Sequence, residues 1–322
     1  MAGVSLKKNK IVAIVQARCN SIRLPNKIMR KIAGIPAIEL LYNRLTLSKE
    51  LDKIVIATSK NGANKKLISF CKKKQIDYFL GSENNVLKRY FDACKIFKAD
   101  IIVRITGDSI LIDPRLVDKI IKLFKINKVD YVSNIDPPTF PDGLDVEVFS
   151  KKCLEKTYKQ VKKEYDKEHV TSYIKSSKKF KTINYKSNID YSNIRWSLDQ
   201  KEDLEEISLI AKHFNTNTYF SWKDILKVTE AKKNKFYKNS KIKRNEGAEM
   251  SKTQKLWKRA KQIIPGGNML LSKRPELFLP NRWPAYFSKS KGCHVWDLDK
   301  KKYIDISLMG VGTNILGYAN SK

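Results

Sequence analysis

Three cationic side chains lie close together in the chain, just after a run of apolar residues ends. Arg18, Arg23 and Lys27 follow the apolar segment 11–15, and Ser21 stands among them. Two guanidinium groups and one ammonium suit an extended polyphosphate better than a single carboxylate, because each guanidinium fork can bind two oxygens. A basic loop on a lysine-rich protein can also be merely solvated, so the cations alone leave both interpretations open.

Two aspartates follow other apolar segments and are candidate metal ligands. Asp108 comes after the segment 101–105 and a Thr-Gly turn, whose glycine allows a phosphate to approach the backbone closely. Asp199 ends a later apolar segment. Two oxygen ligands that leave the other coordination positions to phosphate and water are typical of a Mg²⁺ site. Asp199 could instead be the N-cap of a helix that begins at Lys201, a common role for aspartate.

The elements that must position these residues alternate between strand and helix. Apolar runs predict strands over 11–15, 53–58, 76–80, 100–105, 131–134, 144–149, 181–185 and 194–198. Helical patterns lie over 37–47, 64–74, 85–97, 114–124, 151–161, 168–176 and 201–213. Such alternation is typical of an α/β fold with a mainly parallel sheet covered by helices on both faces. Ligands bind at the carboxyl ends of the strands in such sheets, so the cations and aspartates are expected around one cleft.

Five short motifs follow one another from residue 16 to residue 171. They are Q-A-R-x-x-S-x-R-L-P-x-K at 16–27, G-S-E with V-L-K-R-Y at 81–90, R-I-T-G-D at 104–108, D-G-L-D-V-E at 142–147 and E-H-V-T at 168–171. Together they resemble the cytidylyltransferases that activate acidic sugars, a family that includes the CMP-Kdo synthetases and the SpsF-like spore-coat polysaccharide proteins. Residues 199–204 are similar to a late D-x-x-E-D-L motif of that family. The resemblance implies a Rossmann-like nucleotidyltransferase domain over about residues 1–229, with a mostly parallel mixed sheet.

The resemblance also implies a reaction, in which CMP passes from CTP to an acidic sugar or similar acceptor and pyrophosphate leaves, as in the synthesis of surface polysaccharide precursors. The catalytic residues it implies are Arg18, Arg23, Lys27 and Asp108, and Mg²⁺ would be held by Asp108 and Asp199. Nucleotide contacts are expected from Ala17, Arg18, Ser21, Arg23, Lys27, Arg104 and Gly107. No residue stands out as a general base.

The acceptor side of the implied site rests on a period-two pattern and one histidine. Alternation in the segment 142–147 places Asp145 and Glu147 on one face, although a half-buried antiparallel strand would show the same pattern. On the family resemblance that polar face is a wall of the acceptor pocket. The acceptor-binding candidates are Asp142, Asp145, Glu147 and His169.

The net charge of +32 arises from 65 Lys and Arg against 33 Asp and Glu. Such an excess raises the alternative of a non-catalytic module that binds nucleic acid. The lysines are spread along the whole chain, however, and only the segment 232–244 is locally concentrated, with Phe236 and Tyr237 within it. A basic run with aromatic residues can bind single strands, but this run also lies where one domain pattern stops, so a basic linker over 230–250 is favoured and nucleic acid is an unlikely partner.

The last part of the chain has a different character. Residues 251–267 predict a capped helix that ends at a Pro-Gly-Gly turn, and residues 294–305 predict a β-hairpin. With L-W-x-R-A-K, I-P-G-G and V-W-D-L-D, residues 251–322 resemble the amino-terminal segment of class III aminotransferases of the glutamate-1-semialdehyde aminomutase type. On that resemblance the segment is a truncated fusion fragment that binds no pyridoxal phosphate, and Leu308, Met309 and Val311 lack their usual partners. The alternative function is the front part of such an aminotransferase.

Composition places the chain inside the cell. The five cysteines are odd in number and widely spaced, which favours reduced thiols over a disulfide framework or a zinc site. The first ten residues lack the apolar segment of a secretory signal, and no apolar run is long enough to span a bilayer. A cytoplasmic location is therefore expected, and the family resemblance adds a possible homodimer.

Overall fold

The computed structural model describes residues 9–21, 23–215, 218–232, 236–237, 239, 242, 244, 251–268, 274–277, 284–305 and 317–319. The chain divides into two compact units, a first unit over Met1–Ile242 and a second unit over Lys243–Lys322. Within the described ranges, no helix is both long and apolar enough to cross a membrane.

The first unit is built on a seven-stranded sheet with the order β5-β4-β1-β6-β8-β7-β9. Four neighbouring strands run parallel: β5 (Tyr78–Gly81), β4 (Lys53–Ser59), β1 (Ile11–Gln16) and β6 (Ile101–Thr106). Strand β8 (Glu147–Ser150) is antiparallel to both β6 and β7 (Tyr131–Ser133), and β7 pairs in parallel with β9 (Thr182–Asn184). The predicted mostly parallel mixed sheet is confirmed.

Strand β1 is central, and both of its faces are buried. Ile11, Ala13 and Val15 enter one hydrophobic core, whereas Val12 and Ile14 enter a second core on the other face. Because the side chains of residues 11–15 are buried on both faces of the sheet, this part of the strand is a continuous apolar run and not an alternating one.

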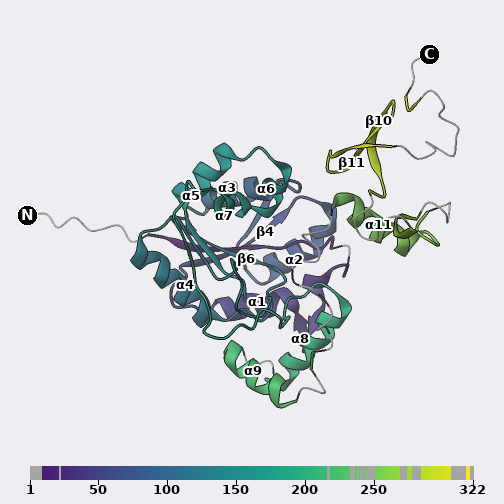
Figure 1. Ribbon diagram of the computed structural model, residues 1–322. Helices are drawn as coiled ribbons and strands as arrows, with labels where there is room; N and C mark the ends of the chain where they lie inside the picture. The colour runs from purple at the N-terminus through teal and green to yellow at the C-terminus, as the bar shows by residue number, and fades with distance from the viewer. Residues whose placement is uncertain are drawn as a thin grey trace, which may run out of the picture. The chain divides into compact units, whose positions relative to one another are not determined.

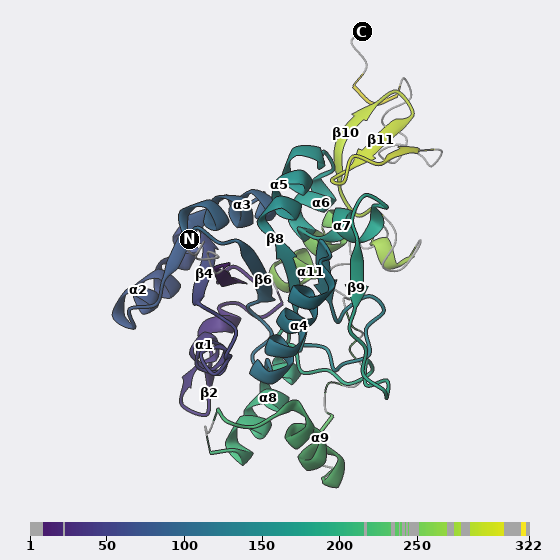
Figure 2. The same cartoon turned by 90° about the vertical axis from the view of Figure 1, so that its left-hand side faces the viewer.

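Helices cover both faces of this sheet (Figure 1). The core that contains Ile11 is covered by α1 (Ala37–Leu45), α2 (Lys65–Lys73), α4 (Pro114–Asn127), α8 (Lys201–His213) and α9 (Trp222–Ala231). The other core is covered by α3 (Val86–Ile96), α5 (Lys151–Gln160) and α7 (Ser172–Ser176), with α6 (Glu164–His169) beside α3. Figure 2 likewise separates α8 and α9 from α3 and α5. Short elements complete the unit: the 3-10 turns η1 (Lys27–Met29) and η2 (Gly62–Asn64), and the two-stranded ribbon β2 (Lys31–Ile32) and β3 (Ile35–Pro36).

Three predicted elements differ from the structure, and one helix was missed. The predicted strand over 144–149 begins only at Glu147. The segment 194–198 forms only an isolated bridge, between Arg195 and Asp142, because its backbone bonds to two loops and not to one neighbouring strand. The predicted helix over 168–176 is two helices, α6 and α7, which are separated where Val170 takes a φ of 60°. Helix α9 was not predicted.

The first unit extends beyond the predicted domain end at residue 229. Phe236 is buried in its core, and the Tyr237 hydroxyl donates a hydrogen bond to the Thr229 hydroxyl at 3.1 Å. These residues belong to the basic run that sequence analysis assigned to a linker. A buried Phe236 has no ring face free for base stacking, so this part of the nucleic-acid alternative is wrong. Most other residues of the run lie outside the described residues.

The second unit contains the predicted helix and hairpin. Helix α11 (Lys252–Ile263) is capped by the Ser251 side chain, which accepts a hydrogen bond from the Gln254 backbone. Strands β11 (His294–Asp297) and β12 (Lys302–Ile304) form the hairpin, to which β10 (Phe287–Lys291) adds a third strand. A 3-10 turn, η4, spans Pro275–Leu277. The predicted exposed residues Leu308, Met309 and Val311 lie outside the described residues.

Candidate functional site

One ammonium group joins the two aspartates that the sequence singled out. Lys27 Nζ lies 3.1 Å from Asp108 Oδ2 and 2.7 Å from Asp199 Oδ1. Arg23 adds a guanidinium nitrogen 2.8 Å from the other oxygen of Asp199. We call these four residues, Arg23, Lys27, Asp108 and Asp199, the Lys27 group. The predicted meeting of Arg23, Asp108 and Asp199 at one place is present in the structure, and their catalytic roles stay predictions.

Backbone contacts bring the two aspartates together. The Leu198 N–H donates a hydrogen bond to the Asp108 carbonyl oxygen at 3.0 Å, which places Asp199 beside Asp108. The preceding residue, Gly107, donates its N–H to the Gln16 carbonyl oxygen at 2.8 Å. A Cβ at position 107 would lie 2.9 Å from the Gln16 carbonyl oxygen, so only glycine allows the end of β6 to approach the end of β1 this closely.

The opposite charges of the Lys27 group stabilise the ionised forms of Lys27 and Asp199. Burial by itself would raise the pKa of Asp199, but Lys27, Arg23 and Arg195 lower it to about 2. Burial would lower the pKa of Lys27, but Asp108 and Asp199 raise it above its ordinary value. Both charges are therefore present at neutral pH. The alternative that Asp199 is an N-cap is wrong, because Gln200 caps helix α8.

The loop after β1 holds the other predicted phosphate contacts. Ala17 is buried and continues the sheet, with its N–H bonded to the Ala57 carbonyl oxygen at 3.1 Å. Cys19 anchors the loop through a 2.8 Å hydrogen bond from its N–H to Asn64. Arg18 is exposed and Ser21 is half-buried. Arg18 is thus placed for a ligand that approaches from solvent, whereas Lys27 is held inside the ion-paired group.

Arg104 and Glu147 form a second, separate polar cluster. They make an ion pair between neighbouring strands β6 and β8. Glu147 Oε1 also accepts hydrogen bonds from the Tyr131 hydroxyl at 2.6 Å and the Thr171 hydroxyl at 2.5 Å. Burial would raise the pKa of Glu147, but Arg104 and these donors lower it. Glu147 is buried, so its described contacts make it an internal counterion of Arg104.

Two of the four predicted acceptor residues, Asp142 and Glu147, are buried in ion pairs, and the acceptor role of all four stays a prediction. Strand β8 begins only at Glu147, so the period-two argument does not apply to Asp145, which lies half-buried in the preceding loop. Asp142 contacts Arg195 at 2.8 Å. His169 ends helix α6, where its ring lies 4.3 Å from the ring of Tyr165.

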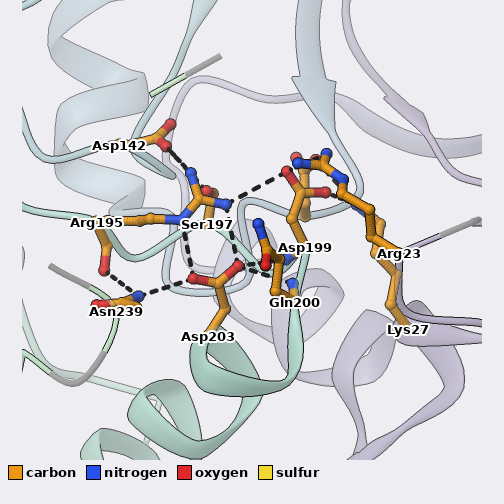
Figure 3. Close-up of polar contacts among 10 residues, drawn as sticks. Arg23, Lys27, Asp142, Arg195, Ser197, Asp199, Gln200, Asp203 and Asn239 are labelled. Carbon is orange, nitrogen blue, oxygen red and sulfur yellow. Dashed lines mark hydrogen bonds and ion pairs between the residues drawn. The ribbon is translucent and has the colours of Figure 1, made fainter. Parts of the chain in front are cut away.

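A second cluster contacts Asp199 and was not predicted from the sequence (Figure 3). We call it the Arg195 group, and its members are Asp142, Arg195, Asp203 and Asn239. The Arg195 guanidinium lies within 3.0 Å of both Asp203 oxygens and 3.4 Å from Asp199 Oδ2. A signal was available for Asp203, because it is the second aspartate of the D-x-x-E-D-L motif. Nothing in the basic run pointed to Asn239.

The residues present fit a divalent metal ion. Asp108 and Asp199 already approach a single cationic atom, Lys27 Nζ, at hydrogen-bonding distance, so both carboxylates can reach one cation. Among the described residues there is no group of three or more His, Cys, Asp and Glu side chains that could hold a metal. Two carboxylates leave positions for phosphate oxygens and water, which is how Mg²⁺ is commonly held beside nucleotides.

The central strands of the sheet are parallel, and helices cover both of its faces. Cations and carboxylates follow the carboxyl ends of β1 and β6. This arrangement is characteristic of α/β nucleotide-binding proteins. Residues 12–242 match the family model described as Cytidylyltransferase. The chain therefore belongs to the cytidylyltransferase family. The expectation drawn from the five motifs is confirmed at that level.

Individual relatives agree with this assignment. The spore coat polysaccharide biosynthesis protein SpsF of Bacillus subtilis is 30% identical over 210 residues, which are 63% of this chain and 86% of SpsF. A 3-deoxy-manno-octulosonate cytidylyltransferase of Arabidopsis thaliana is 30% identical over 143 residues, 43% of this chain and 48% of that protein. The solved structure of a cytidylyltransferase from Leptospira borgpetersenii is 32% identical, with a TM-score of 0.68 over 70% of this chain and 96% of that one.

The family match ends at residue 242, so it does not bear on residues 251–322. The resemblance of that segment to class III aminotransferases stays a prediction.

Proposed function

We propose that the protein transfers CMP from CTP to an acidic sugar or a similar acidic acceptor, with release of pyrophosphate, in the synthesis of a surface polysaccharide precursor. The observation that supports it most directly is the convergence of Asp108 and Asp199 on Lys27 in a member of the cytidylyltransferase family. The acceptor class follows from the relatives, because one is named for spore coat polysaccharide and another for an octulosonate.

In the proposed reaction an acceptor oxygen attacks the α-phosphorus of CTP. A new oxygen–phosphorus bond forms, the bond from the α-phosphorus to the bridging oxygen breaks, the acceptor proton passes to water, and pyrophosphate leaves. The protein's part is positioning and charge stabilisation. Arg18, exposed on the loop, and Arg23 and Lys27 hold phosphate oxygens and stabilise the charge that develops on pyrophosphate.

Asp108 and Asp199 would hold Mg²⁺, which when bound screens the phosphate charge and lowers the pKa of an attacking hydroxyl. The same two carboxylates contact Lys27 at 3.1 and 2.7 Å. With a divalent cation on the two aspartates, the Lys27 ammonium would be available to phosphate oxygens. A cytoplasmic location and a homodimer stay predictions from the sequence.

The test is a pyrophosphate-release assay with each of the four common nucleoside triphosphates and a panel of acidic sugars. We expect release with CTP and at least one acidic acceptor. Asp108→Ala should lower kcat/KM by about a hundredfold or more, as expected for loss of a group that stabilises transition-state charge. Asp92→Ala is a matched control, because Asp92 also pairs with a lysine, Lys88, but on the surface of α3. Equal turnover by Asp108→Ala and Asp92→Ala would remove Asp108 from the site.

A further inference from the structure

Arg195 is a buried cation in contact with Asp199 that does not belong to the phosphate-binding loop. Its side chain is 4% exposed, whereas that of Arg23 is 27% exposed. The guanidinium meets Asp203 through two nitrogens, at 2.9 and 3.0 Å, and Asp142 through a third, at 2.8 Å. Because carboxylates bind this planar guanidinium group on two sides, its orientation is fixed.

The two oxygens of Asp199 have different partners. Oδ1 contacts Lys27, and Oδ2 contacts Arg23 at 2.8 Å and Arg195 at 3.4 Å. Lys27 and Arg23 are the cations that the proposed function assigns to phosphate binding, so their contacts with Asp199 would be given up to the nucleotide. Arg195 is fixed by Asp142 and Asp203, so it stays on Oδ2 and leaves Oδ1 available to a metal ion.

The backbone of Asp199 is fixed by the same cluster. Asp203 Oδ2 accepts hydrogen bonds from the Asp199 N–H and from the Gln200 N–H, both at 2.9 Å. Asp203 thus holds the main chain of Asp199 while Arg195 contacts its side chain. Close packing of a neighbouring loop adds to this, because a Cβ on Gly143 would lie 2.6 Å from the Trp196 carbonyl carbon.

Asn239, which lies in the chain segment after α9, also contacts the Arg195 group. It is 2% exposed, and its Nδ2 donates to the Arg195 carbonyl oxygen at 3.1 Å and to Asp203 Oδ1 at 2.8 Å (Figure 3). One amide therefore bonds both to the main chain of Arg195 and to the carboxylate that orients its guanidinium.

We infer that Arg195 is a positioning residue that holds the Asp199 carboxylate ready for a divalent cation, and that Asn239, outside the predicted domain, holds Arg195 in place. The inference rests on the proposed function. Partners that orient a metal ligand in this way usually change metal affinity by about 10- to 100-fold when they are altered. Asn239, in the segment after α9, would then help to position the proposed metal site.

The experiment measures Mn²⁺ binding to the full chain in the presence of a non-hydrolysable CTP analogue, by water proton relaxation, together with the melting temperature. We expect Arg195→Lys to raise the Mn²⁺ dissociation constant about tenfold or more, since a lysine ammonium lacks the rigid planar fork that contacts Asp203 through two nitrogens and Asp142 through a third. Asn239→Ala should raise it less, and Asn239→Asp more than Asn239→Ala, because a carboxylate there repels Asp203. Lys232→Ala, an exposed change in the same segment, should leave it unaltered.

The result that overturns the inference is an unchanged Mn²⁺ dissociation constant in Arg195→Lys and in both Asn239 variants, whether or not the melting temperature falls. If Arg195→Lys does not fold, the Mn²⁺ dissociation constants of the two Asn239 variants test the inference. Asp199→Asn separates the two proposals. If it weakens Mn²⁺ binding while the other variants do not, only the positioning inference fails, and if Asp199→Asn itself binds Mn²⁺ normally, the proposed metal site fails.

Discussion

The Leu198 N–H donates a hydrogen bond to the carbonyl oxygen of Asp108, and this contact places Asp199 beside Asp108. It joins the loop after β6 to the segment before α8. Because the contact is made by main-chain atoms, exchanging either carboxylate for an amide leaves it intact. Variants of the two aspartates therefore keep this backbone contact, although they lose an ion pair with Lys27.

Lys27→Met should destabilise the ligand-free protein. The change removes the cation that pairs with Asp108 and Asp199 and leaves two carboxylates close together, a defect that costs about 3–5 kcal/mol when the pair is fully buried. Millimolar Mg²⁺ should restore more of the melting temperature in Lys27→Met than in the unaltered protein, because the metal replaces the missing charge. Lys53→Met, at the exposed Lys53–Asp77 pair, should cost about 1 kcal/mol or less and show no such response. An equal Mg²⁺ response in all three proteins would contradict the shared cation site.

Stability should fall in acid through Asp199. Burial would raise the pKa of this carboxyl, but Lys27, Arg23 and Arg195 lower it from 3.8 to about 2. A lowered folded-state pKa stabilises the fold above the unfolded value, and that contribution is lost as the pH falls through the folded value. The loss for Asp199 should amount to about 2 kcal/mol between about pH 5 and pH 2. In urea unfolding, Asp199→Asn should show a shallower decline over this range, and parallel curves would disprove the assignment.

Gly143→Ala should destabilise the first unit. Gly143 has a φ of +99°, which side chains rarely adopt, and an added Cβ would lie 2.6 to 2.7 Å from backbone atoms of Trp196 and Ser197. Strain of this kind costs about 1–3 kcal/mol, and the displaced loop should also disturb Asp142 and Arg195. Gly62→Ala is the control, since a Cβ there meets no atom within 4 Å. Denaturant unfolding measures both, and equal stability of the two variants would show that the close approach is unimportant.

Phe236→Ala tests whether the segment after α9 is part of the fold. Phe236 is 6% exposed and packs in the core that contains Ile11. Removing a buried phenylalanine side chain costs about 3–5 kcal/mol, so the melting temperature should fall clearly. The exposed Tyr219 is 67% accessible, and Tyr219→Ala should change stability little. A linker that does not pack, as the sequence suggested, would give no difference between the two variants.

Most of the sheet and its helices could be predicted because their signals are local. Helix α8 was predicted with its observed bounds, and the ranges predicted for β1 and β4 were each one residue too short. The segment 194–198 was mistaken for a strand because an apolar run does not reveal which backbone groups it will bond to. Asp145 and Glu147 were grouped for a similar reason, since alternation predicts a shared face only where a strand exists.

The sequence by itself determined that this chain is a cytidylyltransferase-like α/β protein with a cationic loop after its first strand and carboxylates at two other segment ends. Those features depend on neighbouring residues and on short motifs, which are visible in one dimension. Only the tertiary structure decided that Lys27 joins Asp108 to Asp199, that Glu147 is a buried partner of Arg104, and that Asn239 supports Arg195. These pairings join residues far apart in the chain, and charge neutralisation between them depends on distances that only folding sets.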